Sequence, residues 1–259
     1  MVLIFIDHSE GHIKKSSFEA LTYGADLAKQ LGVAAEGLLL GTVNDDLAAL
    51  GKYGVSKVNQ VNQESLNQLD AQVYTRIIAE AVAATGAKVI VFSHNQNGRA
   101  VAASVGARLK AGVVTGAVAL PVTTDGFVVK KSVFSAKAFA NVRINSDIKV
   151  ISLNPNSYRI VAGEGSATVN QLALTPATPK VKVVSVNKVK GEVPLTEAEI
   201  VVSGGRGFKG PENWGMLEEL AKVLHAATAC SRPVADAHWR PHHEHVGQTG
   251  IQIAPNLYF

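Results

Sequence analysis

Residues 70–93 read DAQVYTRIIAEAVAATGAKVIVFS and carry the clearest structural signal in the chain. Up to Thr85 the apolar side chains recur every three or four residues, which predicts an amphipathic helix, and Gly86 is a typical helix stop. Residues 88–93 are a β-branched apolar run, which predicts a buried strand. A helix that leads directly into a buried strand is the repeating unit of a parallel α/β sheet.

The same alternation continues on both sides of this unit. Further helix signals cover residues 16–31, 45–51 and 99–110; the first is opened by Ser16 or Ser17 and closed by Gly32. Further strand signals cover residues 2–7, 34–40, 56–61 and 113–122. Together they predict a mainly parallel sheet with helices on both faces. Residues 127–134, 141–144, 149–153 and 181–186 are also strand-like and fit an antiparallel extension of that sheet.

A polar segment divides the chain into two expected domains. Residues 187–196 are polar and contain Gly and Pro, so we place the boundary near residue 192, between domains 1–191 and 192–259. The second domain opens with a strand and glycine turn over residues 199–207. A helix over residues 213–225 and a short strand over residues 226–230 follow, which restarts the α/β pattern.

The composition excludes several classes of protein. The 259 residues include 25 Lys and Arg against 21 Asp and Glu, and 47% are apolar. This apolar content supports a large core and excludes global disorder. Because basic and acidic residues are interleaved, we expect no binding of nucleic acid.

The sequence also indicates a cellular compartment. No stretch approaches the ~20 apolar residues of a membrane helix, so we expect no membrane insertion. The apolar run at residues 1–6 lacks the basic region and cleavage site of a signal peptide. Cys230 is the single cysteine, which excludes an internal disulfide and fits a reducing compartment. We therefore expect a cytoplasmic protein.

Three segments of the second domain could hold a ligand. In residues 203–207, SGGRG, glycines let backbone N–H groups surround an anion and Arg206 adds a fixed charge, although a plain tight turn is equally consistent. Ser231 and Arg232 follow the next strand and should face the same crevice, since carboxyl ends of parallel strands share an edge. Gln248 and Thr249 lie between two glycines; their polar groups suit the edge of a heteroaromatic ring, and a β-turn is the alternative.

Other chemistry is weakly indicated. The histidines of residues 238–245 lack the spacing of a structural zinc site, and we expect them in a solvated loop. No nucleophile elbow or zinc-protease motif is present, and Cys230 is expected in a core strand. His8 and His94 each follow a strand and could touch a ligand or partner.

The motifs of the second domain, taken together, resemble one family closely. Residues 201–207, 212–214, 229–237, 246–250 and 254–258, in that order and spacing, resemble the alpha subunit of electron transfer flavoproteins. Residues 94–109 are similar to a segment of that family's N-terminal domain. The resemblance implies a mainly parallel, adenine-nucleotide-hydrolase-like α/β domain followed by an incomplete Rossmann-like or flavodoxin-like FAD-binding domain.

The resemblance also implies a function. In this family a heterodimer with a beta subunit carries electrons on FAD from dehydrogenases, such as the acyl-CoA dehydrogenases of fatty acid beta-oxidation, to a downstream acceptor. Such a protein is an electron carrier rather than a catalyst with its own substrate, and we expect it in the bacterial cytoplasm. Outer-sphere electron transfer requires no acid–base pair, in keeping with the absence of one.

Residue roles follow from the same resemblance. Arg206 and Ser231 are expected near the FAD diphosphate, and Arg232 beside the isoalloxazine ring. Gln248 and Thr249 are expected to line the ring, with the Thr249 hydroxyl near N5. A fixed cation beside the ring favours the reduced, more negative flavin and raises its potential. Arginine suits this role because it is planar and permanently charged.

The sequence departs from the family pattern in two places, and two alternative functions remain open. The family continues beyond the segment that matches residues 257–258 with residues that hold adenosine, so we expect weak or absent FAD binding by this chain. Residues 242–245 replace a loop that typically contains Asn and Asp. One alternative is a partner-docking scaffold without flavin. The other is an ATP-binding or hydrolytic enzyme of similar fold, which the lack of a phosphate loop disfavours.

Overall fold

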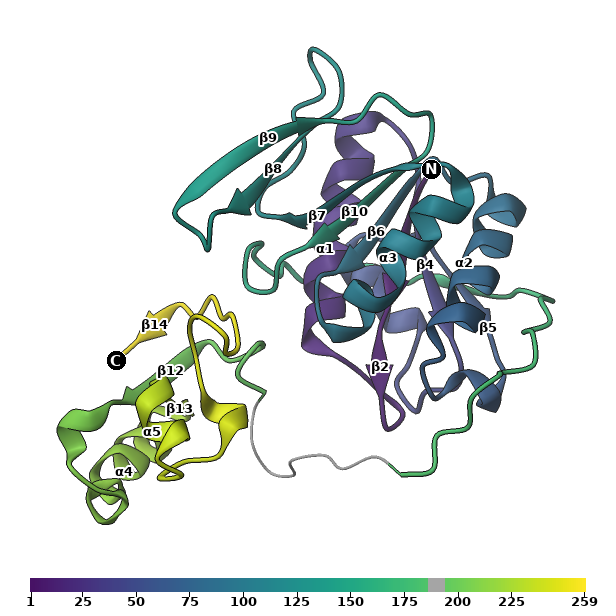
Figure 1. Cartoon of the computed structure of the whole chain (residues 1–259). Helices are drawn as coiled ribbons and strands as arrows, with labels where there is room; N and C mark the ends of the chain where they lie inside the picture. Colours follow the sequence, from purple (N-terminus) through teal and green to yellow (C-terminus); the bar gives the residue numbers. More distant parts are fainter. Residues whose placement is uncertain (186–193) are drawn as a thin grey trace. The chain divides into compact units, whose positions relative to one another are not determined.

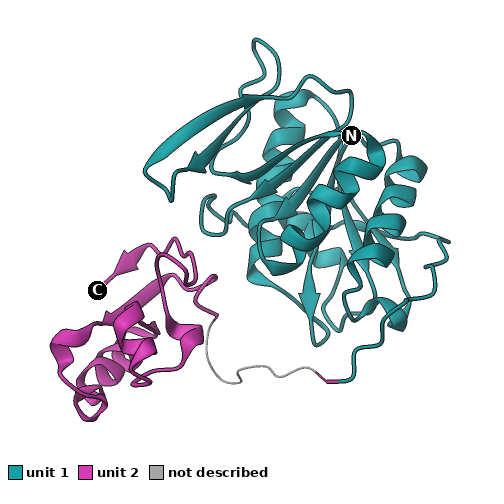
Figure 2. Ribbon diagram, viewed as in Figure 1, with its two compact units in different colours: residues 1–184 teal, residues 185–259 magenta. Residues whose placement is uncertain are grey.

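The computed structural model describes residues 1–185 and 194–259, which form two compact units, 1–184 and 185–259 (Figures 1 and 2). The predicted domain boundary at residue 192 lies outside the described residues. Each unit is an α/β structure, which confirms the predicted class of a mainly parallel sheet domain followed by a smaller α/β unit. Among the described helices, none combines the length and the apolar character needed to cross a membrane.

Within the described residues, unit 1 is built on a nine-stranded sheet with the order β11-β5-β4-β1-β6-β10-β7-β8-β9. From β11 through β7 every neighbouring pair is parallel, and β8 and β9 continue the sheet antiparallel. The strands are β1 (Val2–Ile6), β4 (Ala35–Leu40), β5 (Lys57–Val61), β6 (Val89–Ser93), β7 (Gly112–Ala117), β8 (Val128–Val133), β9 (Ala138–Arg143), β10 (Lys149–Leu153) and β11 (Thr168–Gln171).

Helices cover both faces of this sheet (Figure 1). The helices are α1 (Lys15–Leu31), α2 (Ala71–Thr85) and α3 (Gln96–Leu109), with short 3-10 turns η1 (Ala48–Tyr53) and η2 (Glu64–Leu66) and a hairpin of β2 (His8–Ser9) and β3 (His12–Ile13). Ile4 and Ile6 pack in the cluster that contains α1, whereas Leu3 and Phe5 pack with α2 and α3. This alternation follows from the two-residue period of a strand.

Three predicted helix boundaries are wrong. Ser16 and Ser17 lie inside α1 rather than capping it, because the Ser17 hydroxyl bonds the backbone N–H and carbonyl of Asp7, each at 2.8 Å. Helix α3 begins at Gln96, not at residue 99, because the Asn95 side chain accepts the backbone N–H of Gly98 at 3.0 Å. The short helix expected at residues 45–51 is η1, which begins at Ala48.

The predicted strands after residue 113 need larger corrections. β10 is not part of the antiparallel extension; it lies between β6 and β7 and is parallel to both, because residues 150–153 are buried and suit a central strand. β7 ends at Ala117, next to Gly116 with its φ of 75°. Residues 181–185 form no strand, and residue 186 is not described; β11 pairs with β5 instead.

Unit 2, as described over residues 194–259, has a three-stranded parallel sheet with the order β13-β12-β14. Its elements are β12 (Ile200–Gly204), η3 (Arg206–Phe208), η4 (Pro211–Asn213), α4 (Gly215–Leu224), β13 (Ala227–Cys230), α5 (Arg232–Asp236), η5 (His242–Glu244) and β14 (Leu257–Tyr258). The predicted order of strand, glycine turn, helix and short strand is confirmed. Cys230 is 1% exposed, as a core position requires.

A buried carboxylate organises the carboxyl edge of the unit 1 sheet. Asp7 follows β1 and is 4% exposed. Its Oδ2 accepts hydrogen bonds from Lys14 Nζ and Asn95 Nδ2, and its Oδ1 accepts one from Asn97 Nδ2, all at 2.8 Å. The carboxylate therefore joins β1 to the beginnings of α1 and α3, with its charge paired and its lone pairs satisfied.

Removal of this carboxylate should destabilise unit 1. We expect Asp7→Ala to lower the free energy of unfolding by about 2–4 kcal/mol, because Lys14 and two amides lose their acceptor. Asp125→Ala is the matched control, since its ion pair with Arg143 is exposed at both ends, and its effect should stay within about 0.5 kcal/mol. Urea denaturation followed by circular dichroism measures both; equal effects would contradict the assignment.

His94 should make the stability of unit 1 depend on pH. Its Nδ1 contacts Ser152 Oγ at 2.8 Å, and burial, with Arg99 and Lys131 adding repulsion, lowers the pKa of His94 to about 4 from 6.5. The unfolded chain therefore binds the proton more readily. Stability should be complete above pH 6.5 and fall by about 1–2 kcal/mol between pH 6.5 and 4, after allowance for partial exposure. His94→Gln should flatten this profile in urea titrations; identical profiles for parent and variant would count against it.

Candidate functional site

Three predicted site segments meet at the carboxyl ends of β12 and β13. The backbone N–H of Ser231 donates to the Gly204 carbonyl at 3.0 Å, which joins the glycine turn to the start of α5. The backbone N–H of Val246 donates to the Cys230 carbonyl at 3.1 Å, which ties the loop of residues 247–250 to the same strand end. The residues that follow β12 and β13 therefore emerge at one shared sheet edge, as the sequence predicted.

The glycine turn is shaped by the side chains packed against it. A Cβ atom on Gly204 would lie 2.4 Å from Trp214 Cη2, so only glycine fits there. A Cβ on Gly205 would lie 3.7 Å from Ser231 Oγ, which places the turn in contact range of that hydroxyl. Arg206 begins η3, is exposed, and forms no ion pair with any described residue. Its guanidinium is available to an anion.

Ser231 and Arg232 begin the short helix α5. Ser231 occupies the N-cap position, and its hydroxyl caps no N–H among the described residues, so it is free to bind. Arg232 Nε donates to Asp236 Oδ2 at 3.3 Å. The side chains of Arg232 and Asp236 are 62% and 56% exposed, respectively. Such a pair contributes only a few tenths of a kcal/mol, so Arg232 can exchange it for a ligand.

Gln248 and Thr249 project from a tight turn. Gly250 N–H donates to the Gly247 carbonyl at 3.0 Å, and Thr249 has a left-handed φ of 65°. Both side chains are exposed, and the Thr249 hydroxyl donates to the Gln248 carbonyl at 2.6 Å. The β-turn that the sequence allowed as an alternative is thus present, and it exposes the Gln248 amide and the Thr249 hydroxyl.

The loop of residues 242–245 is only partly solvated, which corrects the prediction. His242 and His243 are exposed, but Glu244 is 2% and His245 is 6% exposed. His245 forms a parallel bridge with Cys230, and the Glu244 carboxylate receives the Arg240 side chain. Sequence reasoning missed both roles; the four-residue spacing of Arg240 and Glu244 was the available signal.

Cys230 lies beneath the site as a neutral thiol. Burial, and then the negative charge of Glu244, raise the pKa of Cys230 to about 11, although Arg240 opposes the shift. A thiol with this pKa is not a nucleophile near neutral pH, which agrees with the predicted structural role.

The other flagged histidines serve unit 1. His8 Nε2 donates to the Leu40 carbonyl at 2.7 Å, and His94 bonds Ser152. In the described residues no three or more His, Cys, Asp or Glu side chains gather closely enough to hold a metal ion.

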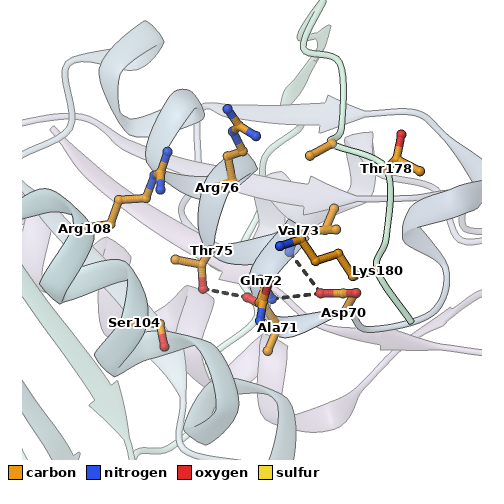
Figure 3. A pocket seen from close by; sticks show the side chains of 11 residues that line it. Asp70, Ala71, Gln72, Val73, Thr75, Arg76, Ser104, Arg108, Thr178 and Lys180 are labelled. Atoms are coloured by element: carbon orange, nitrogen blue, oxygen red, sulfur yellow. Dashed lines mark hydrogen bonds between the residues drawn. The ribbon is translucent and has the colours of Figure 1, made fainter. Parts of the chain in front are cut away.

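A separate cleft in unit 1 escaped the sequence analysis. It has a volume of about 560 Å³ and lies where the start of α2, the end of α3 and residues 177–180 converge (Figure 3). Arg76 is paired with Glu80 at 3.5 Å, whereas Arg108 and Lys180 have no partner among the described residues. Asp70 is already used as the cap of α2. The cleft is weakly basic, and no predicted site residue lines it.

Comparison with known proteins identifies related sequences across both units. The electron transfer flavoprotein domain model matches residues 2–177, and the electron transfer flavoprotein FAD-binding domain model matches residues 194–259. The chain is 32% identical to the electron transfer flavoprotein subunit alpha of Syntrophomonas wolfei, with 98% of this chain and 80% of the relative covered. It is 29% identical to the subunit alpha of Bacillus subtilis, with 99% and 80% covered. It is 27% identical to protein FixB of Clostridium saccharobutylicum, with 99% and 79% covered.

Gly204 offers a test of how the glycine turn is packed. We expect Gly204→Ala to destabilise unit 2 by about 1–3 kcal/mol, because the added methyl would overlap Trp214. The control is Gly207→Ala, where a Cβ meets nothing within 4 Å in the described structure. Both tryptophans of the chain, Trp214 and Trp239, lie in unit 2. Tryptophan fluorescence during urea denaturation therefore reports this unit, and equal midpoints for the two variants would refute the packing argument.

Proposed function

Because this chain belongs to the electron transfer flavoprotein alpha-subunit family, we propose that the edge formed by β12, β13 and residues 247–250 is its FAD site. As a member of this family, the chain functions in electron transfer, and its cofactor is FAD. The observation that carries the site is the convergence of three polar segments on one strand edge, two of which each carry an exposed arginine, Arg206 and Arg232.

The donor set of this edge fits the two halves of the flavin cofactor. Arg206, the backbone at Gly205 and the Ser231 hydroxyl would bind the diphosphate, which carries the negative charge that such donors favour. Arg232, Gln248 and Thr249 would lie along the ring, where an amide and a hydroxyl can satisfy its polar edge. FAD supplies the redox chemistry when bound.

Each of these side chains would act without moving a proton. Arg232 would keep a permanent positive charge beside the ring and so favour the form with added electrons. The Thr249 hydroxyl would turn from the Gln248 carbonyl towards the ring. Because the protein residues only bind and orient, we assign no catalytic residue.

The partners follow from the same family. The relatives are named as alpha subunits, and we propose that this chain forms a heterodimer with a beta subunit. Dehydrogenases, with acyl-CoA dehydrogenases of fatty acid oxidation as one class, would donate the electrons. The single, buried Cys230 supports a reducing, cytoplasmic location.

Arg232 provides the direct test. In the complex with the beta subunit, we expect Arg232→Ala to weaken FAD binding about tenfold, the loss of one charge-assisted contact, and to lower the flavin potential. Arg143→Ala, which removes an exposed arginine of unit 1, should change neither.

Flavin fluorescence titration and redox titration make these measurements. Unchanged affinity and potential in Arg232→Ala would refute the assigned role. A complex that purifies with its beta subunit and never takes up flavin would favour the scaffold alternative.

A further inference from the structure

A buried ion pair lies directly behind the proposed FAD site. Arg240 Nε and Nη2 donate to the two carboxylate oxygens of Glu244 at 2.8 and 2.5 Å. Arg240 Nη1 donates to Glu218 Oε1 at 2.7 Å. The Glu244 side chain is only 3% exposed, whereas that of Glu218 is 51% exposed. Arg240 therefore both neutralises the charge of the buried Glu244 carboxylate and fixes its orientation.

Glu244 is connected to the loop that is proposed to face the flavin. It ends η5, with its N–H bonded to the Pro241 carbonyl at 3.0 Å, and His245 then pairs with Cys230. Two residues after Glu244, the N–H of Val246 bonds the end of β13. Residues 247–250 follow directly, so the ion pair is separated from Gln248 and Thr249 by a short stretch of backbone that is itself hydrogen-bonded.

Arg240 also contacts the ring that packs beneath the glycine turn. Its guanidinium carbon lies 5.8 Å from the centre of the Trp214 ring. That ring fills the space under Gly204, and Glu218 lies on α4, one turn beyond Trp214. The Arg240 side chain thus contacts both Trp214, which packs beneath the glycine turn, and Glu244, which precedes the loop of residues 247–250.

We propose that Arg240 is a positioning residue of the FAD site, which holds Glu244 so that Thr249 and Gln248 are presented to the flavin ring. This inference rests on the proposed function. Arg240 itself does not touch the cofactor. Its fork-shaped guanidinium fixes the position of Glu244 and therefore of the loop that follows. Compared with two apolar side chains, a buried ion pair adds little net stability, but it fixes the orientation of both partners.

A double-mutant cycle separates positioning from general damage. In the complex with the beta subunit, FAD binding is measured by flavin fluorescence for Arg240→Met, Thr249→Ala and the pair. We expect Arg240→Met to weaken binding about tenfold, as loss of a supporting contact does at other sites. Thr249→Ala should then have little further effect, because the hydroxyl is already displaced.

Three further variants serve as matched controls. Arg240→Lys keeps the charge without the fork and should restore only part of the affinity. Glu218→Gln alters the exposed partner of the same arginine and should leave affinity within about twofold of the parent. Arg232 lies on a different segment, so the loss of FAD affinity in Arg232→Ala should add to the loss in Arg240→Met.

The outcomes are distinct. Additive losses for Arg240→Met and Thr249→Ala, or parent-like affinity in Arg240→Met, would overturn the inference. If Arg240→Met does not fold, Arg240→Lys takes its place in the cycle with the same criteria. FAD binding that Arg232→Ala weakens and Arg240→Met does not would overturn this inference only. Absence of flavin binding in the parent complex would overturn the proposed function and this inference with it.

Discussion

In unit 2, β12 and β13 run parallel with Gly204 opposite Cys230, and the geometry of the candidate FAD site depends on that register. Parallel pairing brings both strands to their ends at one edge, so the residues that follow them must emerge side by side. Val246 then adds its N–H to the Cys230 carbonyl. Three segments distant in sequence are thereby held together by backbone hydrogen bonds, before any side chain takes part.

The side chains at this edge divide into a free set and a committed set. Arg206 has no ion-pair partner among the described residues, and the pair of Arg232 with Asp236 is exposed. Behind them, Trp214 is 2% exposed and Glu244 is held by two hydrogen bonds from Arg240. Donors that remain free on a rigid support lose little entropy and break few bonds when a ligand binds.

The equivalent edge of unit 1 is organised in the opposite way. Asp7 follows its first strand, but Lys14, Asn95 and Asn97 already satisfy both carboxylate oxygens. His94 is likewise engaged, by Ser152. An edge whose polar groups bind one another has little to offer a ligand. The two units thus share an α/β design, but Asp7 and His94 at the strand ends of unit 1 are bonded within the protein, whereas Arg206 at the strand end of unit 2 forms no ion pair with a described residue.

The sequence by itself determined the elements whose signals are local. The periodicity of residues 70–85, the stop at Gly86 and the β-branched run after it were sufficient for α2 and β6. The sharing of one edge by Arg206, Ser231 and Arg232 was also predictable, because it follows from strand direction. Only the tertiary structure decided that β10 enters the middle of the sheet and that Glu244 and His245 are buried. Those outcomes depend on pairing with residues far along the chain, and a burial that is created by a distant partner leaves no periodic trace in the segment itself.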